Sequence, residues 1–295
     1  IPQLINRWFH ERAGFFIGLC MAFTGIGGAL WSALFTALRS GGMDYHTIYL
    51  IWGVIALVTS LPFTLFCIRT RPEDAGLAPY GAKVAADGVA AKPNGISAKP
   101  AMRMPVFYAL CLFAGIINVA VLIAQQFPTY TKTLTDATFD VVVVGGLMAT
   151  VMMVGQAIFK IVLGAAADKD AKGALWFAFA AGVGGVLLCW LGSASEYMMY
   201  VGPFIFGAFY ATAVVLVPIV VKQVFGLRDN AIIYSRISTV FNFIAAFGSM
   251  IWAWIGSSFG FNAVFAVGLV MIVAVLLLGL YSFSQAKRLR GQWTE

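Results

Sequence analysis

Long uninterrupted apolar segments are the feature that most constrains how this chain can fold. Lipid offers the backbone no hydrogen-bond partner, so a segment that crosses it has to be helical or part of a closed barrel. Crossing takes about 20 apolar residues in a helix, and runs such as 273–280 are apolar on every face, which argues against barrel strands. We therefore predict an all-α polytopic membrane helix bundle of about eight transmembrane helices, each long enough to cross with some tilt, at residues 14–38, 46–68, 104–127, 141–165, 173–192, 198–221, 232–257 and 260–284.

Composition agrees with this class of protein. Of the 295 residues, 61% are hydrophobic and 11% charged, which leaves too little polar surface for a soluble domain of this length. The net charge is +7, and the charged residues lie mainly between the apolar segments instead of on one soluble face. We therefore expect a lipid bilayer as partner and no nucleic acid.

The basic residues also predict an orientation. With residues 1–13 placed in the cytoplasm, only Arg39 and Lys132 fall on the outer side, and cytoplasmic loops are the ones that concentrate Lys and Arg. We expect a multi-pass protein of the cell (inner) membrane with residues 1–13, the linker 69–103 and the C-terminus cytoplasmic. Sixteen basic residues then lie on the inner side: Arg7, Arg12, Arg69, Arg71, Lys83, Lys92, Lys99, Arg103, Lys169, Lys172, Lys222, Arg228, Arg236, Lys287, Arg288 and Arg290.

Prolines and glycines divide the chain. The polar, proline-containing stretch 69–103 predicts a linker that separates two helices (1–68) from six (104–284), with a tail at 285–295. Pro105 is expected to start the third helix and Pro128 to follow its end. Gly14 and Gly18 form a G-x-x-x-G pair, which favours close helix packing in lipid over a direct role in transport.

Lys160 lies inside the fourth predicted span and is the one basic residue assigned to neither side of the membrane. No Asp or Glu lies in any span, and an unpaired ammonium in hydrocarbon costs roughly 3 kcal/mol or more. Two readings are open: Lys160 faces a water-filled cavity or ligand, or its stem extends to the inner interface. Gln156 and Gly164 lie one turn to either side on the same face, which is small or polar throughout except for one methionine, and this favours the cavity.

Other spans carry polar residues at helical spacing. Such residues are as often contacts between helices as parts of a site. The first span also carries polar residues, Thr24 and Ser32, eight positions apart. Because several spans have such residues, we predict a bundle around a polar cavity. The substrate-binding candidates are Lys160, Gln156, Asn118, Gln125, Ser238 and Asn242.

Covalent chemistry and metal binding are not expected. The four cysteines lie singly in apolar segments, the two histidines lie in loops or at a loop edge, and no span holds a His, Asp, Glu and Cys set for catalysis. We expect a non-enzyme with no cofactor, no catalytic residue and no metal ligand.

Four short segments resemble a transporter family. Residues 6–14 resemble the loop that enters the fifth helix of major facilitator superfamily carriers, and residues 71–77 resemble the end of their sixth helix and the start of the central loop. Residues 160–169 resemble the eighth helix with its G-x-x-x-D-R/K loop, and Pro218 with Phe225 and Gly226 resembles the tenth helix and its exit. The oxalate–formate and monocarboxylate porters are the most similar branch.

The resemblance implies an architecture and a function. The spans would be helices five to twelve of a carrier, so the chain would be truncated at its N-terminus, lacking four helices. It would transport a small anionic solute, of the monocarboxylate or oxalate/formate type, by alternating access, as an antiporter or symporter and as a monomer. Gly164, Asp168 and Lys169 would form an inner gate loop.

Three positions depart from the pattern of that branch. The family has an arginine that binds the substrate carboxylate where Lys160 stands, and lysine lacks its bidentate fork. Gln156 stands where monocarboxylate members place an acidic residue for proton coupling, and Phe241 stands where oxalate porters have a lysine. A carrier of another solute class, such as a sugar, drug or nitrate, or a non-transporting sensor of the same fold, therefore stays an open alternative.

Overall fold

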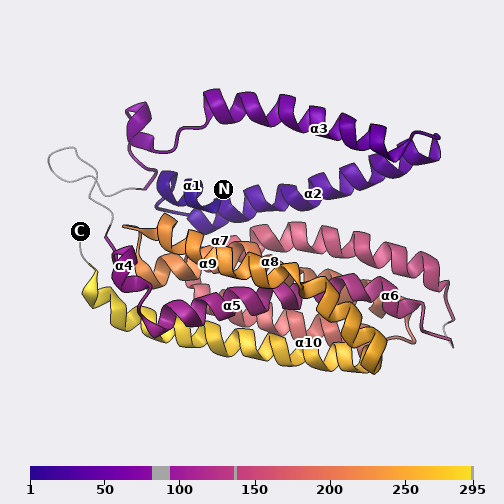
Figure 1. Ribbon diagram of the computed structural model, residues 1–295. Coiled ribbons are helices and arrows are strands. Elements are labelled where there is room, and N and C mark those ends of the chain that lie inside the picture. The colour runs from indigo at the N-terminus through magenta and orange to yellow at the C-terminus, as the bar shows by residue number, and fades with distance from the viewer. Residues whose placement is uncertain (82–93, 136–137, 294–295) are drawn as a thin grey trace.

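The computed structural model describes residues 1–81, 94–135 and 138–293, and its regular structure there is helical apart from two isolated bridges. Short π- and 3₁₀-helical turns are η1 (Phe63–Cys67), η2 (Pro72–Ala75), η3 (Leu122–Gln126) and η4 (Arg290–Gln292). The α-helices, seen in Figure 1, are α1 (Pro2–Trp8), α2 (Ala13–Ser40), α3 (Tyr45–Pro62), α4 (Ala98–Ala101), α5 (Pro105–Val121), α6 (Phe127–Thr131), α7 (Val141–Leu191), α8 (Glu196–Phe225), α9 (Asn230–Ala246) and α10 (Gly248–Leu289).

The longest helices each divide into two membrane crossings. Helix α7 has 51 residues, and at 1.5 Å per residue it would extend about 75 Å, more than twice the hydrocarbon thickness. Its backbone leaves helical geometry at Asp170 (φ −147°, ψ 98°), and that of α10 does so at Gly260 (φ 79°, ψ 172°), a conformation suited to glycine. The break at Asp170 falls between two predicted spans, and the break at Gly260 falls on the first residue of the eighth. All eight predicted spans lie mainly on helical segments.

The end of the third span differs from the prediction. The helical segment continues past Pro128: the 3₁₀ turn η3 leads directly into α6, and Pro128 lies in the first turn of α6. A first-turn proline costs no hydrogen bond, since its missing N–H would have no partner within the helix. Pro105 starts α5 as predicted.

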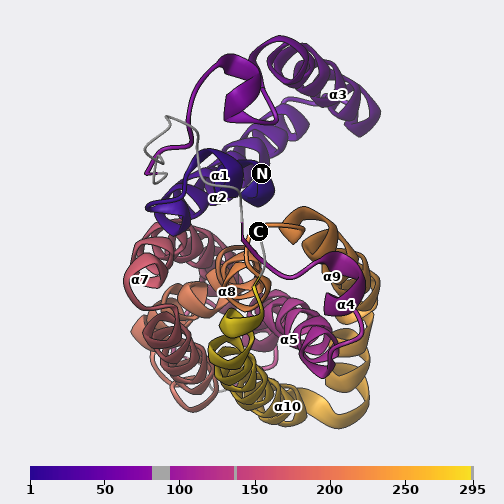
Figure 2. The same cartoon turned by 90° about the vertical axis from the view of Figure 1, so that its left-hand side faces the viewer.

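Helices α5 and α7–α10 form a bundle, and α2 and α3 form a hairpin on one side of it (Figure 2). Helix α2 lies along α7 and α8, whereas α3 diverges from the bundle. In the most apolar 18-residue stretch of α8, 78% of the residues are buried inside the protein. In the corresponding stretch of α3 and η1, none are. The bundle core is built from fully buried residues such as Trp252, Phe113 and Phe206.

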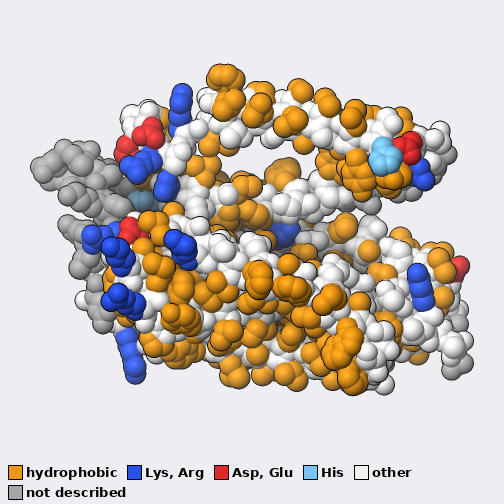
Figure 3. All heavy atoms as spheres, in the orientation of Figure 1, with side chains coloured by type: hydrophobic (Ala, Val, Ile, Leu, Met, Phe, Trp, Pro, Cys, Tyr) orange, Lys and Arg blue, Asp and Glu red, His pale blue; other side chains and the backbone are white. Residues whose placement is uncertain are grey.

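Lys and Arg side chains gather at the end of the molecule that carries α1, α4 and the C-terminal turn (Figure 3). We call this the basic end; of its sixteen predicted members, Lys83 and Lys92 lie outside the described residues. Parts of the linker pair with the bundle here: Gly95 bridges Gly226, and Ala98 N–H donates to the Asp229 carboxylate at 2.8 Å.

Candidate functional site

The contact between α2 and the first limb of α7 is close enough to exclude side chains. A Cβ atom on Gly18 would collide with the carbonyl of Lys160, and one on Gly164 with the carbonyl of Gly14. Two helices approach this closely only where small residues face each other. The packing role predicted for the G-x-x-x-G pair Gly14 and Gly18 is confirmed.

Lys160 lies in the middle of this contact and is 2% exposed. Its Nζ donates to the Thr24 hydroxyl and to the Gln156 amide oxygen, each at 2.9 Å. It stands ten residues before the break at Asp170, about 15 Å along the helix axis. Its ammonium bonds Gln156, which lies one turn farther from that break, so the side chain turns away from the basic end.

Both partners of Lys160 are electrically neutral. The part of the chain that the structure describes places no carboxylate within ion-pair distance of this ammonium, and an ammonium has three N–H donors. Neutral oxygens satisfy its hydrogen bonding but leave its charge uncompensated, which is costly inside a membrane. The arrangement suits a side chain that accepts an anion as a partner.

Thr24 is the residue that sequence reasoning left out of the site. Thr24 is partly exposed on α2; its hydroxyl donates to the Met21 carbonyl of its own helix and accepts from Lys160. The sequence shows Thr24 as a polar residue in an apolar span. It does not show that Thr24 faces Lys160, because that depends on which helix packs against α2. The side chain of Ser32, the other polar candidate of that span, lies outside the described residues.

The other predicted binding residues lie away from Lys160, and three of them have hydrogen-bond partners of their own. Asn118 donates to the Ala114 carbonyl one turn back, and Ser238 does the same to Ser235. Gln125 accepts from Ser249 across η3 and α10 at 2.9 Å, and Asn242 is exposed on α9. The structure therefore joins Lys160 with Gln156 and adds Thr24, and it does not bring the remaining four residues into hydrogen bonds with Lys160.

The predicted gate residues Gly164, Asp168 and Lys169 are helical, and α7 leaves helical geometry at Asp170, just after them. The intervening run of alanines favours helix, which is why the segment does not form the expected loop. Asp168 accepts from the N–H groups of Gly14 at 2.7 Å and Phe15 at 2.8 Å. It thereby caps the N-terminus of α2 from another helix, while Lys169 is exposed.

His10 lies near this cap, in the turn between α1 and α2. Burial lowers the pKa of its imidazole, the nearby Lys222 lowers that pKa further, and Glu73 opposes the shift. Its backbone N–H donates to the Tyr80 carbonyl at 2.9 Å, which ties the start of the linker to the entrance of α2.

Length, hydropathy and packing define a multi-pass α-helical membrane protein with a buried cation between two packed helices. The family model of the Major Facilitator Superfamily matches residues 137–292, more than half of the chain. The chain belongs to this superfamily, whose members are transporters. The match includes Lys160 and Gln156 but not Thr24. No curated protein matches the chain.

Proposed function

We propose that this chain is a carrier of small organic anions, of the monocarboxylate or oxalate/formate type, and that Lys160 binds the carboxylate. The observation that carries the proposal is the buried Lys160 ammonium inside the first limb of α7, held by two neutral oxygens. A carboxylate that enters this contact supplies the negative charge that the resting partners lack. Charge-assisted bonds of this kind are stronger than bonds between neutral groups.

The geometry favours an anion with one carboxylate at the lysine and a polar remainder. A lysine ammonium is a point charge with no planar fork, so it does not clamp both carboxylate oxygens in a fixed plane. Thr24 and Gln156 each offer a group that can turn from Lys160 toward the solute, because a hydroxyl and an amide both donate and accept. Gln156 carries no titratable proton, so any proton coupling runs through other residues.

Transport would proceed by alternating access, with the 1–68 and 104–284 parts moving relative to each other around the α2–α7 contact. By the positive-inside rule the basic end faces the cytoplasm of the inner membrane, and one chain forms the working unit. The empty carrier holds an uncompensated buried cation, and the loaded carrier holds a neutral pair. Closing the carrier around the solute site costs more free energy when the site is empty than when it is loaded. Exchange or coupled entry of the solute is therefore favoured over uncoupled leak.

Asp168 would act as the inner gate in this mechanism. Its two bonds to Gly14 and Phe15 cross from one part to the other at the basic end. Opening toward the cytoplasm requires these bonds to break, so the cap holds this end closed until the solute site is occupied.

Uptake by proteoliposomes tests the solute class. Purified full chain would be supplied in turn with ¹⁴C-labelled formate, oxalate, lactate and glucose. We expect uptake of at least one acid and not of glucose, and a loss of about tenfold to hundredfold in Lys160→Met, the range that a charged hydrogen bond represents. Lys132→Met, an exposed lysine near the opposite end, is the matched control and should transport normally. Glucose uptake alone, or normal acid uptake by Lys160→Met, contradicts the proposal.

A further inference from the structure

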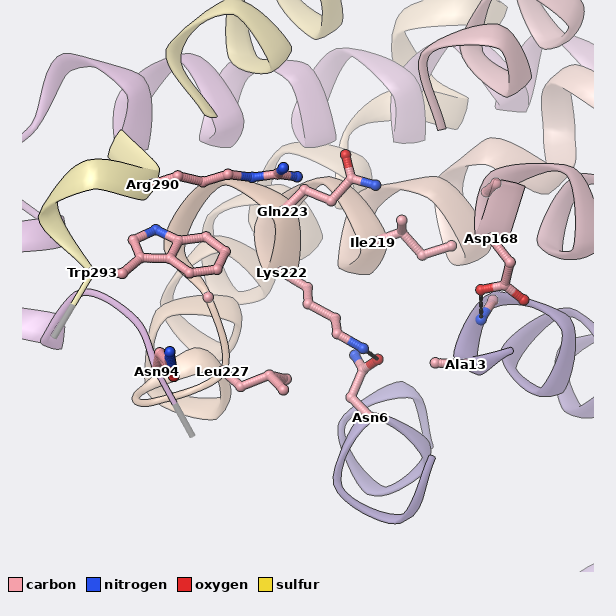
Figure 4. Close-up of a pocket in the computed structure, with 13 residues that line it drawn as sticks. Asn6, Ala13, Asn94, Asp168, Ile219, Lys222, Gln223, Leu227, Arg290 and Trp293 are labelled. Carbon is pink, nitrogen blue, oxygen red and sulfur yellow. Dashed lines mark hydrogen bonds between the residues drawn. The ribbon is translucent and has the colours of Figure 1, made fainter. Parts of the chain in front are cut away.

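A cavity of about 290 Å³ opens at the basic end, where α1 and the start of α2 meet α8 and the C-terminal turn (Figure 4). Lys160 is not part of its wall, so the cavity is separate from the proposed solute site. Its wall includes Asn6, Asp168, Lys222, Arg290 and Trp293.

Two hydrogen-bond donors in this wall are poorly satisfied. The Lys222 ammonium donates to the Asn6 amide oxygen at 3.4 Å, a long bond, and within the described residues it has no carboxylate at ion-pair distance. Asn6 is 2% exposed, and its Nδ2 is buried without a hydrogen-bond partner. Figure 4 shows the two side chains pointing toward each other across the cavity. A buried donor without an acceptor costs about 1–3 kcal/mol, which a suitable ligand would recover.

The remaining charges in the wall leave positive charge in excess. Both oxygens of Asp168 accept from backbone N–H groups of α2, so the helix terminus matches part of its charge, although the carboxylate also acts on Lys222 at longer range. On the C-terminal side, the Arg290 guanidinium lies 6.0 Å from the Trp293 ring centre. The wall therefore presents two cations and an unsatisfied amide against one satisfied carboxylate.

We propose that this cavity is a second anion site, which binds a phosphate or carboxylate group between Lys222, the Asn6 amide and Arg290. A ligand of this class accepts the two donors that the protein leaves open and balances the excess charge. Since Asn6 belongs to the N-terminal part and Lys222 and Arg290 to the C-terminal part, the anion connects the two and stabilises the closed basic end. The source is either a soluble phosphorylated or carboxylated molecule or the phosphate of a lipid headgroup, and the experiment separates the two.

Thermal unfolding of the full chain in a neutral maltoside detergent provides the test. In one arm, inorganic phosphate is titrated against sodium chloride at equal ionic strength, which controls for screening. In the other, phosphatidylglycerol is compared with diacylglycerol, which lacks the phosphate. Lys222→Met keeps the aliphatic stem and removes the charge, and the exposed Lys287→Met removes the same charge at the same end outside the cavity.

We expect phosphate or phosphatidylglycerol to raise the Tm, and Lys222→Met to raise the concentration for half of the effect by about tenfold or more. Lys287→Met and Lys160→Met should respond like the wild type, which separates this site from the proposed solute site. An effect of phosphate indicates a soluble ligand, and an effect of the lipid alone indicates a headgroup. If Lys222→Met does not fold, Arg290→Met, a change at an exposed residue, takes its place. No rise with either anion, or the same response in Lys222→Met (or its substitute) as in Lys287→Met, overturns the proposal.

Discussion

The first limb of α7 makes two charged contacts with α2, and they differ in how the charge is satisfied. At the basic end, the Asp168 carboxylate accepts two backbone N–H groups that α2 cannot use internally. In the middle, the Lys160 ammonium meets only a hydroxyl and an amide. Both side chains face α2. The charge of Asp168 is matched by the N-terminus of α2, whereas the charge of Lys160 has no opposite charge beside it among the described residues.

The difference separates a structural charge from one suited to a ligand. A helix N-terminus carries roughly half a positive charge, so Asp168 is compensated in the resting structure. Lys160 has no such compensation and is more deeply buried, and an uncompensated charge inside a membrane is costly. We therefore propose that Asp168 holds the contact and that Lys160 binds the anion.

The largest expected loss of stability comes from a substitution that pushes α2 away from α7 and so disturbs the Asp168 and Lys160 contacts together. In Gly18→Val, the new side chain would collide with the Lys160 carbonyl, so α2 has to move away from α7. We expect the free energy of unfolding to fall by about 1–3 kcal/mol, the usual cost of overpacking, as measured by chemical denaturation in detergent.

Gly27→Val is the matched control for this change, because it adds the same side chain to the same helix where no atom lies within 4 Å. Its stability should stay within about 0.5 kcal/mol of the wild type, as for most exposed substitutions. Equal losses in the two variants would mean that the close contact between α2 and α7 does not exist.

A smaller effect is expected at the basic end alone. Asp168→Ala removes the cap of α2 and should cost about 0.5–2 kcal/mol. Hydrogen exchange gives a local measurement, since the amides of Gly14 and Phe15 lose their acceptor and should exchange faster.

Asp140→Ala is the control for the loss of a cap, because Asp140 accepts from Val142 and Val143 at the start of its own helix. It should accelerate exchange at those two amides and leave Gly14 and Phe15 unchanged. Slow exchange of Gly14 and Phe15 in Asp168→Ala would show that Asp168 does not hold α2.

The smallest effect concerns pH at the basic end. Burial and Lys222 lower the pKa of His10 below its unfolded value of about 6.5, so the unfolded chain binds more protons near that pH. Stability should therefore fall as pH drops through about 6.5 and stop falling below the pKa of the folded state. His10→Gln should reduce this slope in a series of Tm values from neutral to acidic pH, and exposed His46→Gln should keep it. An unchanged slope in His10→Gln would remove His10 from the account.

The membrane helices could be predicted from the sequence because lipid imposes both length and backbone pairing on each of them. The two breaks were predictable for the same reason, since helices of the observed lengths cannot stay in the bilayer without them. The extent of helix around Asp168 was not predicted. The family resemblance implied a loop there, but the alanines before Asp168 favour helix, and α7 continues through this segment.

The candidate site was predictable only along single helices. Gln156 precedes Lys160 by one turn, so helical periodicity alone places them together. Thr24 and the contact of Gln125 with Ser249 join helices that are distant in sequence, and no pattern within one span specifies which helix faces it. The use of Asp168 as a cap for α2 was hidden for the same reason.

Equilibrium binding tests the central assignment more directly than transport, because a defect in uptake also arises from a defective gate. The transported ¹⁴C-labelled acid would be bound to purified full chain by scintillation proximity, in a Lys222→Met background that removes the second proposed anion site. We expect Lys160→Arg to keep measurable affinity and Lys160→Met to raise the Kd by at least about tenfold. Equal Kd values for Lys160 and Lys160→Met in that background would contradict the account.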